Sequence, residues 1–185
     1  MFDEILFALW FFLPAGIANL VPVFAAHIPL LKKLESPMDF GLMYHGKRVF
    51  GAHKTWRGMI AGIIFGTLTL WLQQYLFTES SWVRSFAGDV DYTTLPTLIM
   101  GPLFAIGALG GDAIESFFKR QRGIAPGKGW FPFDQTDFII GGAIATMPFV
   151  SLSILQYLWL IILWLVIHVV TSVIGYFLHF KDTPI

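Results

Sequence analysis

Acidic and basic side chains gather in residues 110–142, a segment that lies between two long apolar runs. Four carboxylates and four basic residues lie close together there: Asp112, Glu115, Asp134, Asp137, Lys119, Arg120, Arg122 and Lys128. Long apolar runs flank the segment on both sides. Because ionisable groups at membrane depth are costly, they usually face the interior of a helix bundle and serve a function. Carboxylates beside basic residues at a membrane surface indicate metal and phosphate chemistry.

Helical spacing organises the first half of this segment. Asp112, Glu115, Ser116 and Lys119 follow at i, i+3, i+4 and i+7, which is one face of a helix. Asp112 has no basic residue one turn away, so internal pairing explains it poorly. Glu115 has two interpretations: a site residue, or a helix-end carboxylate paired with Lys119.

The second half carries Asp134 and Asp137, again at i, i+3. Acidic residues at the start of a helix can simply cap it, with Asp134 at the N-cap and Asp137 at the third helical position. The alternative is a carboxylate cluster with Asp112. Magnesium is usually held by one or two carboxylates together with substrate phosphates. We therefore predict that Asp112, Asp134 and Asp137 bind Mg²⁺.

Two further segments offer phosphate contacts. The glycine- and proline-rich loop after residue 122 carries Lys128, which could neutralise a phosphate that the backbone N–H groups approach. Lys54 and Arg57 flank Trp56, so charge and an aromatic face lie together and could hold a phosphate and stack a base. The alternative for this second group is a juxtamembrane anchor. Asn19, in a proline-broken helix, could contact substrate or restore backbone hydrogen bonds at the kink.

The composition requires a membrane. Of 185 residues, 56% are hydrophobic and 13% are charged, with a mean hydropathy of +0.68, which is too apolar for a soluble domain of this size. The chain has no cysteine, which excludes disulfides, a thiol nucleophile and a cysteine metal site. The first apolar run lacks a basic n-region and a small-residue cleavage site, so we expect a retained helix.

We predict an all-α integral membrane protein of one domain, residues 1–185, with about five transmembrane helices. The expected helices are residues 5–26, 58–77, 92–117, 134–155 and 158–180, and the cytoplasmic loops are residues 27–57 and 118–133. The count falls to four if the first helix is only interfacial. Nearly all basic residues fall in the loops on one side, so the N-terminus is expected outside and the C-terminus in the cytoplasm.

These motifs resemble the CTP-dependent lipid cytidylyltransferases. Ser116-Phe117-Phe118-Lys119-Arg120, a proline-bearing loop and Asp134-Gln135-Thr136-Asp137 are similar to that family's C-terminal signature, and Lys54-Thr55-Trp56-Arg57-Gly58 is similar to its Lys-Thr-Trp-Glu-Gly element. Where the phosphatidate branch has Asp-Arg, this chain has Asp134-Gln135. The order and spacing of motifs over nearly the whole chain are closer to the archaeal-type branch, the CDP-archaeol synthases.

The resemblance implies transfer of CMP from CTP to a lipid phosphate, such as 2,3-bis-O-geranylgeranylglycerol 1-phosphate, with release of pyrophosphate. It implies Mg²⁺ on Asp112, Asp134 and Asp137, and catalytic roles for these three and Lys119. It assigns nucleotide or phosphate binding to seven residues: Lys54, Thr55, Trp56, Arg57, Ser116, Arg120 and Lys128. Expected partners are CTP, the lipid phosphate and the bilayer, with no nucleic acid.

Three alternatives remain open from the sequence. The lipid product could be CDP-diacylglycerol, made by a phosphatidate cytidylyltransferase activity. Intramembrane carboxylates and proline-broken helices also suit a small ion-coupled transporter, although the charges cluster at one face and not at the midplane. A purely structural membrane protein would bind no nucleotide. We expect a multi-pass protein of the cell membrane whose site faces the cytoplasm.

Overall fold

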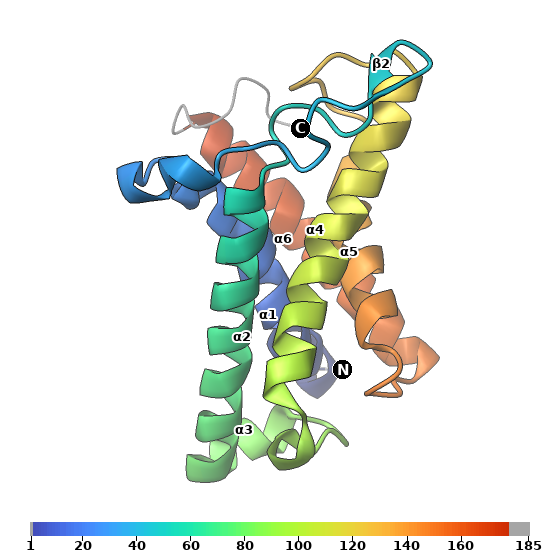
Figure 1. Cartoon of the computed structure of the whole chain (residues 1–185). Helices are drawn as coiled ribbons and strands as arrows, with labels where there is room; N and C mark the ends of the chain where they lie inside the picture. Colours follow the sequence, from blue (N-terminus) through green and yellow to red (C-terminus); the bar gives the residue numbers. More distant parts are fainter. Residues whose placement is uncertain (1, 178–185) are drawn as a thin grey trace.

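Five helices run alternately up and down and carry their loops at two opposite ends (Figure 1). The computed structural model describes residues 2–177. The five helices are α1 Phe2–Ala25, α2 Trp56–Glu79, α4 Thr97–Gln121, α5 Phe133–Thr146 and α6 Ile154–Phe177. The N-terminus of α1 and the start of α4 lie at one end, and the loops after α1 and α4 lie at the other.

The short elements belong to the connections. Five of them are present among the described residues: η1 Pro29–Leu34, β1 Met43–Tyr44, β2 Lys47–Arg48, α3 Ser81–Phe86 and η2 Tyr92–Thr94. The strands form an antiparallel hairpin in which Met43 pairs with Arg48 and Tyr44 with Lys47. The hairpin sits beside the end of α4, where Lys47 Nζ donates to the carbonyl of Gln121 at 2.6 Å. The long loop after α1 thus reaches across to α4.

The helices confirm the predicted all-α, multi-pass membrane class. Four described helices are long and apolar enough to cross a bilayer: α1, α2, α4 and α6. The short helix is α5, with 14 residues that rise about 21 Å; the expected helix over residues 134–155 ends at Thr146. The sequence leaves open whether the first helix crosses the membrane, and α1 is one of the four helices that are long and apolar enough to do so. Helix α4 begins at Thr97, later than expected, because Tyr92–Thr94 forms η2.

An aromatic core holds α1, α4, α5 and α6 together. Phe12 makes ring contacts with Phe104, Phe138 and Trp164, at centroid distances of 6.1, 6.3 and 5.7 Å. The Trp164 indole N–H donates to the carbonyl of Ala8 at 3.0 Å, which satisfies a polar group inside the apolar core. Helix α1 therefore fills the centre of the bundle, and it stays continuous through Pro14 and Pro22.

Glycines bring α4 and α5 into backbone contact. A Cβ at Gly107 would overlap the carbonyl oxygen of Gly141, and a Cβ at Gly111 would overlap the carbonyl oxygen of Asp137. Small residues of this kind let membrane helices approach closely. The contact joins the polar end of α4 to the first turns of α5, and so places Asp112 beside Asp137.

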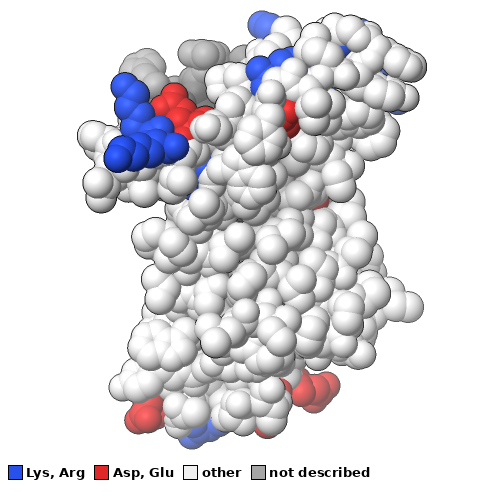
Figure 2. All heavy atoms as spheres, viewed as in Figure 1, with Lys and Arg blue, Asp and Glu red and all other residues white. Residues whose placement is uncertain are grey.

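The charges lie at the two ends of the bundle (Figure 2). A wide band without charged residues separates them on the face shown, as expected for the surface that meets the acyl chains. Most of the basic atoms in this view are at the end that carries the first and third loops. The candidate site lies at that end.

Candidate functional site

A buried carboxylate organises the first loop. The side chain of Asp39 is fully buried and accepts hydrogen bonds from the backbone N–H groups of Gly41, Phe50 and Gly51, at 3.0, 3.0 and 2.9 Å. It also accepts from the Arg48 guanidinium. Burial by itself raises the pKa of Asp39, but these hydrogen bonds outweigh burial and hold its pKa well below the usual range. Asp39 thereby fixes the loop segment of residues 50–54 that borders the site.

Asp39→Asn is expected to loosen this loop, because the amide NH₂ would face backbone donors that the carboxylate accepts. One unsatisfied buried donor costs about 1–3 kcal/mol. The native carboxylate contributes stability above its unfolded pKa, about 3.9, and the contribution disappears only as pH falls through the lowered folded pKa. Near neutral pH, trypsin should therefore cleave residues 36–55 faster in the variant. The control is Asp89→Asn, in the exposed loop after α3; equal cleavage in both variants contradicts the role of Asp39.

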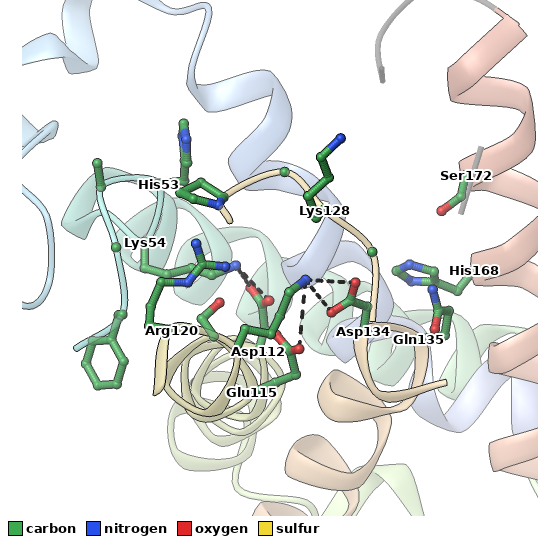
Figure 3. Close-up of a pocket in the computed structure, with 18 residues that line it drawn as sticks. His53, Lys54, Asp112, Glu115, Arg120, Lys128, Asp134, Gln135, His168 and Ser172 are labelled. Carbon is green, nitrogen blue, oxygen red and sulfur yellow. Dashed lines mark hydrogen bonds and ion pairs between the residues drawn. The ribbon is translucent and has the colours of Figure 1, made fainter. Parts of the chain in front are cut away.

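A cavity of about 410 Å³ opens between this loop, α4, the loop before α5, the start of α5, and α6 (Figure 3). Charged and polar residues from all five segments line it: Lys54, His53, Asp112, Glu115, Ser116, Lys119, Arg120, Lys128, Asp134, Gln135, His168 and Ser172. Residues 50–52, Pro126, Gly127 and Gly129 complete the wall. The cavity has the size of a small-ligand site. We name it the polar cavity.

Three carboxylates meet beside the polar cavity. One oxygen from each of Asp112, Glu115 and Asp137 lies within 4.8 Å of the others, a spacing that suits a single metal ion. Among the residues that the structure describes, one buried Glu115 oxygen has no hydrogen-bond partner, so the cluster has an acceptor to spare. The set is all oxygen, which Mg²⁺ prefers. It differs from the predicted set in that Glu115 takes the place expected for Asp134.

Two lysines neutralise the carboxylates that face the cavity. Lys54 Nζ contacts both carboxylate oxygens of Asp112, at 2.7 and 2.5 Å. Lys119 Nζ contacts both oxygens of Asp134, at 2.7 and 2.9 Å, and lies 3.9 Å from Glu115. Lys54 lies 58 residues before Asp112 in sequence, so the contact joins the first loop to α4. Both cations line the polar cavity, where a phosphate could compete for them.

Asp134 does not cap α5. The N-cap residue is Pro132, without a side-chain cap, and the Asp134 carboxylate accepts from the Trp130 N–H at 2.8 Å, outside the helix. Asp134 therefore holds the loop before α5 against Lys119. The simple pairing of Glu115 with Lys119 is also secondary, because Lys119 lies more than 1 Å closer to Asp134.

Helix α2 begins within the Lys-Thr-Trp-Arg-Gly element, so the side chains of this element lie in different surroundings. Only Lys54 enters the polar cavity. Thr55 is the N-cap of α2, and its hydroxyl accepts from the Gly58 N–H at 3.3 Å. The Trp56 ring makes a tilted contact with Phe40, with centroids 6.3 Å apart, and Arg57 lies 3.7 Å from Glu35. Because the first helical turn rotates these side chains apart, Trp56 and Arg57 are absent from the wall of the polar cavity, and the juxtamembrane interpretation describes them better.

A second cavity, of about 340 Å³, adjoins the first and is lined by α1, α2, α4 and the loop before α2. Its lining includes Asn19, Pro22, Met59 and Leu109, and it shares three residues with the polar cavity: His53, Lys54 and Asp112. We name it the apolar cavity. Asn19 therefore faces a cavity, at the level where Pro22 interrupts the hydrogen bonding of α1.

Sequence reasoning missed the wall that α6 supplies. His168 and Ser172, four residues apart on α6, point toward the polar cavity next to Gln135 (Figure 3). The His168 ring also makes a tilted contact with Phe138, with centroids 5.4 Å apart. A histidine inside a long apolar helix is a signal of function, and attention to it would have found this wall. Ser116, Arg120 and Lys128, for which the resemblance implies phosphate binding, also line the cavity.

Comparison with known proteins gives the family. A family model described as "CarS-like: CDP-archaeol synthase" matches residues 1–185. The chain belongs to the CDP-archaeol synthase family. It is 34% identical to the CDP-archaeol synthase of Pyrococcus furiosus, over 97% of this chain and 98% of that protein. It is 32% identical to the CDP-archaeol synthase of Thermococcus onnurineus, over 98% of each.

A solved structure extends the likeness to three dimensions. It covers 91% of this chain and 94% of its own, with a TM-score of 0.68 and 26% identity, and is described as an intramembrane enzyme for archaeal membrane lipids biosynthesis. Membership of the CDP-archaeol synthase family thus agrees with the predicted family and with an enzyme built into the membrane.

Proposed function

We propose that this chain transfers CMP from CTP to the phosphate of a membrane lipid and releases pyrophosphate. The observation that carries the proposal is the meeting of two cavities at Lys54 and Asp112. One cavity is polar and bordered by loops, and the other lies among the transmembrane helices. A water-soluble nucleotide and a lipid phosphate would meet there.

In the proposed reaction a lipid phosphate oxygen attacks the α-phosphorus of CTP. A new P–O bond forms, the bond from the α-phosphorus to the bridging oxygen breaks, and pyrophosphate leaves with the electron pair. Since the attacking oxygen is already anionic, no strong general base is needed. The protein's contribution is to position the reactants and neutralise charge. Lys54 would bind phosphate where the cavities meet, while Lys119, Arg120 and Lys128 would hold the triphosphate.

The carboxylate cluster fits Mg²⁺ by its oxygen donors, its spacing and its spare Glu115 acceptor. Asp112, Glu115 and Asp137 would hold the ion, which when bound neutralises the charge that develops on the phosphates. Asp134 would act differently, by fixing the position of Lys119.

We propose that the lipid enters through the apolar cavity. Its phosphate would reach Lys54, with Asn19 beside the glycerol backbone. The polar cavity would face the cytoplasm, where CTP is found, because the basic loops lie at that end. The charge distribution argues against an ion-coupled transporter, since the carboxylates are at one end of the bundle rather than at its midplane.

The test is direct. Purified protein with labelled CTP, Mg²⁺ and a lipid phosphate should yield a labelled CDP-lipid, and omission of Mg²⁺ should abolish it. Parallel reactions with the geranylgeranyl ether phosphate and with phosphatidate would decide the lipid class, and parallel reactions with UTP and ATP the base. Transport without product, or the absence of nucleotide binding, would overturn the proposal.

A further inference from the structure

A short apolar and basic segment projects from the bundle where α1 ends. Residues 28–34, which include η1, extend sideways past the start of α2 (Figure 1). Ile28, Leu30 and Leu34 are exposed, and Leu30 is 86% exposed. Lys32 and Lys33 lie between these apolar side chains and are exposed as well. We name residues 28–34 the interfacial segment.

The segment lies at a defined depth. It follows α1 after only two residues, and Val23 and Phe24, in the last turn of α1, face outward on the membrane-spanning part of the bundle. Basic atoms cluster on this projection, immediately above the uncharged band (Figure 2). Exposed leucines next to lysines at that level match the boundary between acyl chains and lipid phosphates.

The segment is also tied to the site. Glu35, directly after it, lies 3.7 Å from Arg57. The Trp56 N–H donates to the Ser36 carbonyl at 3.0 Å, and the Met38 N–H donates to the Lys54 carbonyl at 2.7 Å. A continuous set of contacts thus runs from the interfacial segment to the backbone of Lys54, at the junction of the two cavities.

We propose that the interfacial segment is an anchor on anionic lipids. Its leucines insert at the acyl boundary, Lys32 and Lys33 bind lipid phosphates, and the docked segment holds the loop that carries Lys54 at a fixed height above the bilayer. A lysine near an anionic surface strengthens binding by about fivefold. The anchor is a surface separate from both cavities, and it does not depend on the transfer reaction.

The chain contains no cysteine, so a single introduced cysteine carries a unique spin label. The full chain with Leu30→Cys, labelled with a nitroxide in nanodiscs of anionic lipid, should collide readily with oxygen and several-fold less often with a neutral nickel chelate. The matched control is Leu42→Cys, exposed in the loop before β1, where the nickel chelate should have free access.

The role of the two lysine charges is tested with the same spin label at position 30. In the Leu30→Cys protein, more anionic lipid should lower the nickel collision rate, and Lys32→Gln with Lys33→Gln should remove that dependence. A Leu30 label as accessible to nickel as the Leu42 label would overturn the anchor. A label shielded from both oxygen and nickel would overturn it in favour of contact with protein. Both measurements report position alone, so they stand whether or not CMP transfer is observed.

Discussion

Asp137→Asn is expected to lower CDP-lipid formation at least about a hundredfold at a fixed Mg²⁺ concentration. The amide keeps the shape of the side chain but removes one of the three carboxyl groups from the cluster with Asp112 and Glu115. The backbone contact of Asp137 with Gly111 is unaffected, so the protein should fold. Product formation from labelled CTP, alongside thermal unfolding in detergent, measures both effects.

Magnesium separates a ligand role from a structural one. If Asp137 holds the ion, the variant should recover part of its rate as Mg²⁺ is raised, because the two remaining carboxylates bind the ion more weakly. Asp89→Asn, at the opposite end of the bundle, is the matched control and should behave as the native chain. A near-normal rate in Asp137→Asn would remove this residue from the proposed metal site. In Asp134→Asn, by contrast, we expect a raised KM for CTP that extra Mg²⁺ does not lower.

Gly111→Ala is expected to separate α4 from α5. The added Cβ would overlap the carbonyl oxygen of Asp137, which is backbone and cannot rotate away. Overpacking of this kind costs about 1–3 kcal/mol, and a shift of about 1 Å at the site can cost about a hundredfold in rate. We therefore expect both a lower unfolding temperature and a loss of CMP transfer.

The neighbouring glycine is a matched control. A Cβ at Gly110 would meet nothing within 4 Å in the described part of the chain, residues 2–177, and alanine favours a helix over glycine by about 1 kcal/mol. Gly110→Ala should therefore unfold at the same temperature or slightly higher, with a normal rate. Equal behaviour of the two variants, measured by thermal unfolding and turnover in the same detergent, would contradict the close helix contact.

The sequence predicts the helices well because their signal is local. Apolar length identifies α1, α2, α4 and α6, and i, i+3, i+4 spacing puts Asp112, Glu115 and Lys119 on one face. The contacts that join separate segments of the chain have no such local signal. One example is the pairing of Lys119 with Asp134, and another is the presence of Glu115 rather than Asp134 in the carboxylate cluster. Both depend on how closely α4 and α5 approach each other.

Other differences have similar causes. Trp56 and Arg57 follow Lys54 closely in sequence, yet the start of α2 turns them away from the polar cavity. Residues 138–180 form one long run without Asp, Glu, Lys or Arg. The sequence therefore predicts neither the end of α5 at Thr146 nor the contribution of His168, on α6, to the wall of the polar cavity. The role of Asp39 depends on backbone N–H groups, which carry no sequence signature.

The junction of the two cavities bears on the energetic cost of handling a lipid. Removing an acyl or isoprenoid chain from the bilayer costs about 0.8 kcal/mol for each CH₂ group, which quickly exceeds what phosphate contacts could return. Because the apolar cavity lies among the transmembrane helices while sharing Lys54 and Asp112 with the polar one, the proposed route exposes only the head group to the nucleotide. The hydrocarbon chains stay within the bilayer throughout the proposed reaction. The CDP-lipid product can then diffuse away in the plane of the membrane without being extracted from it.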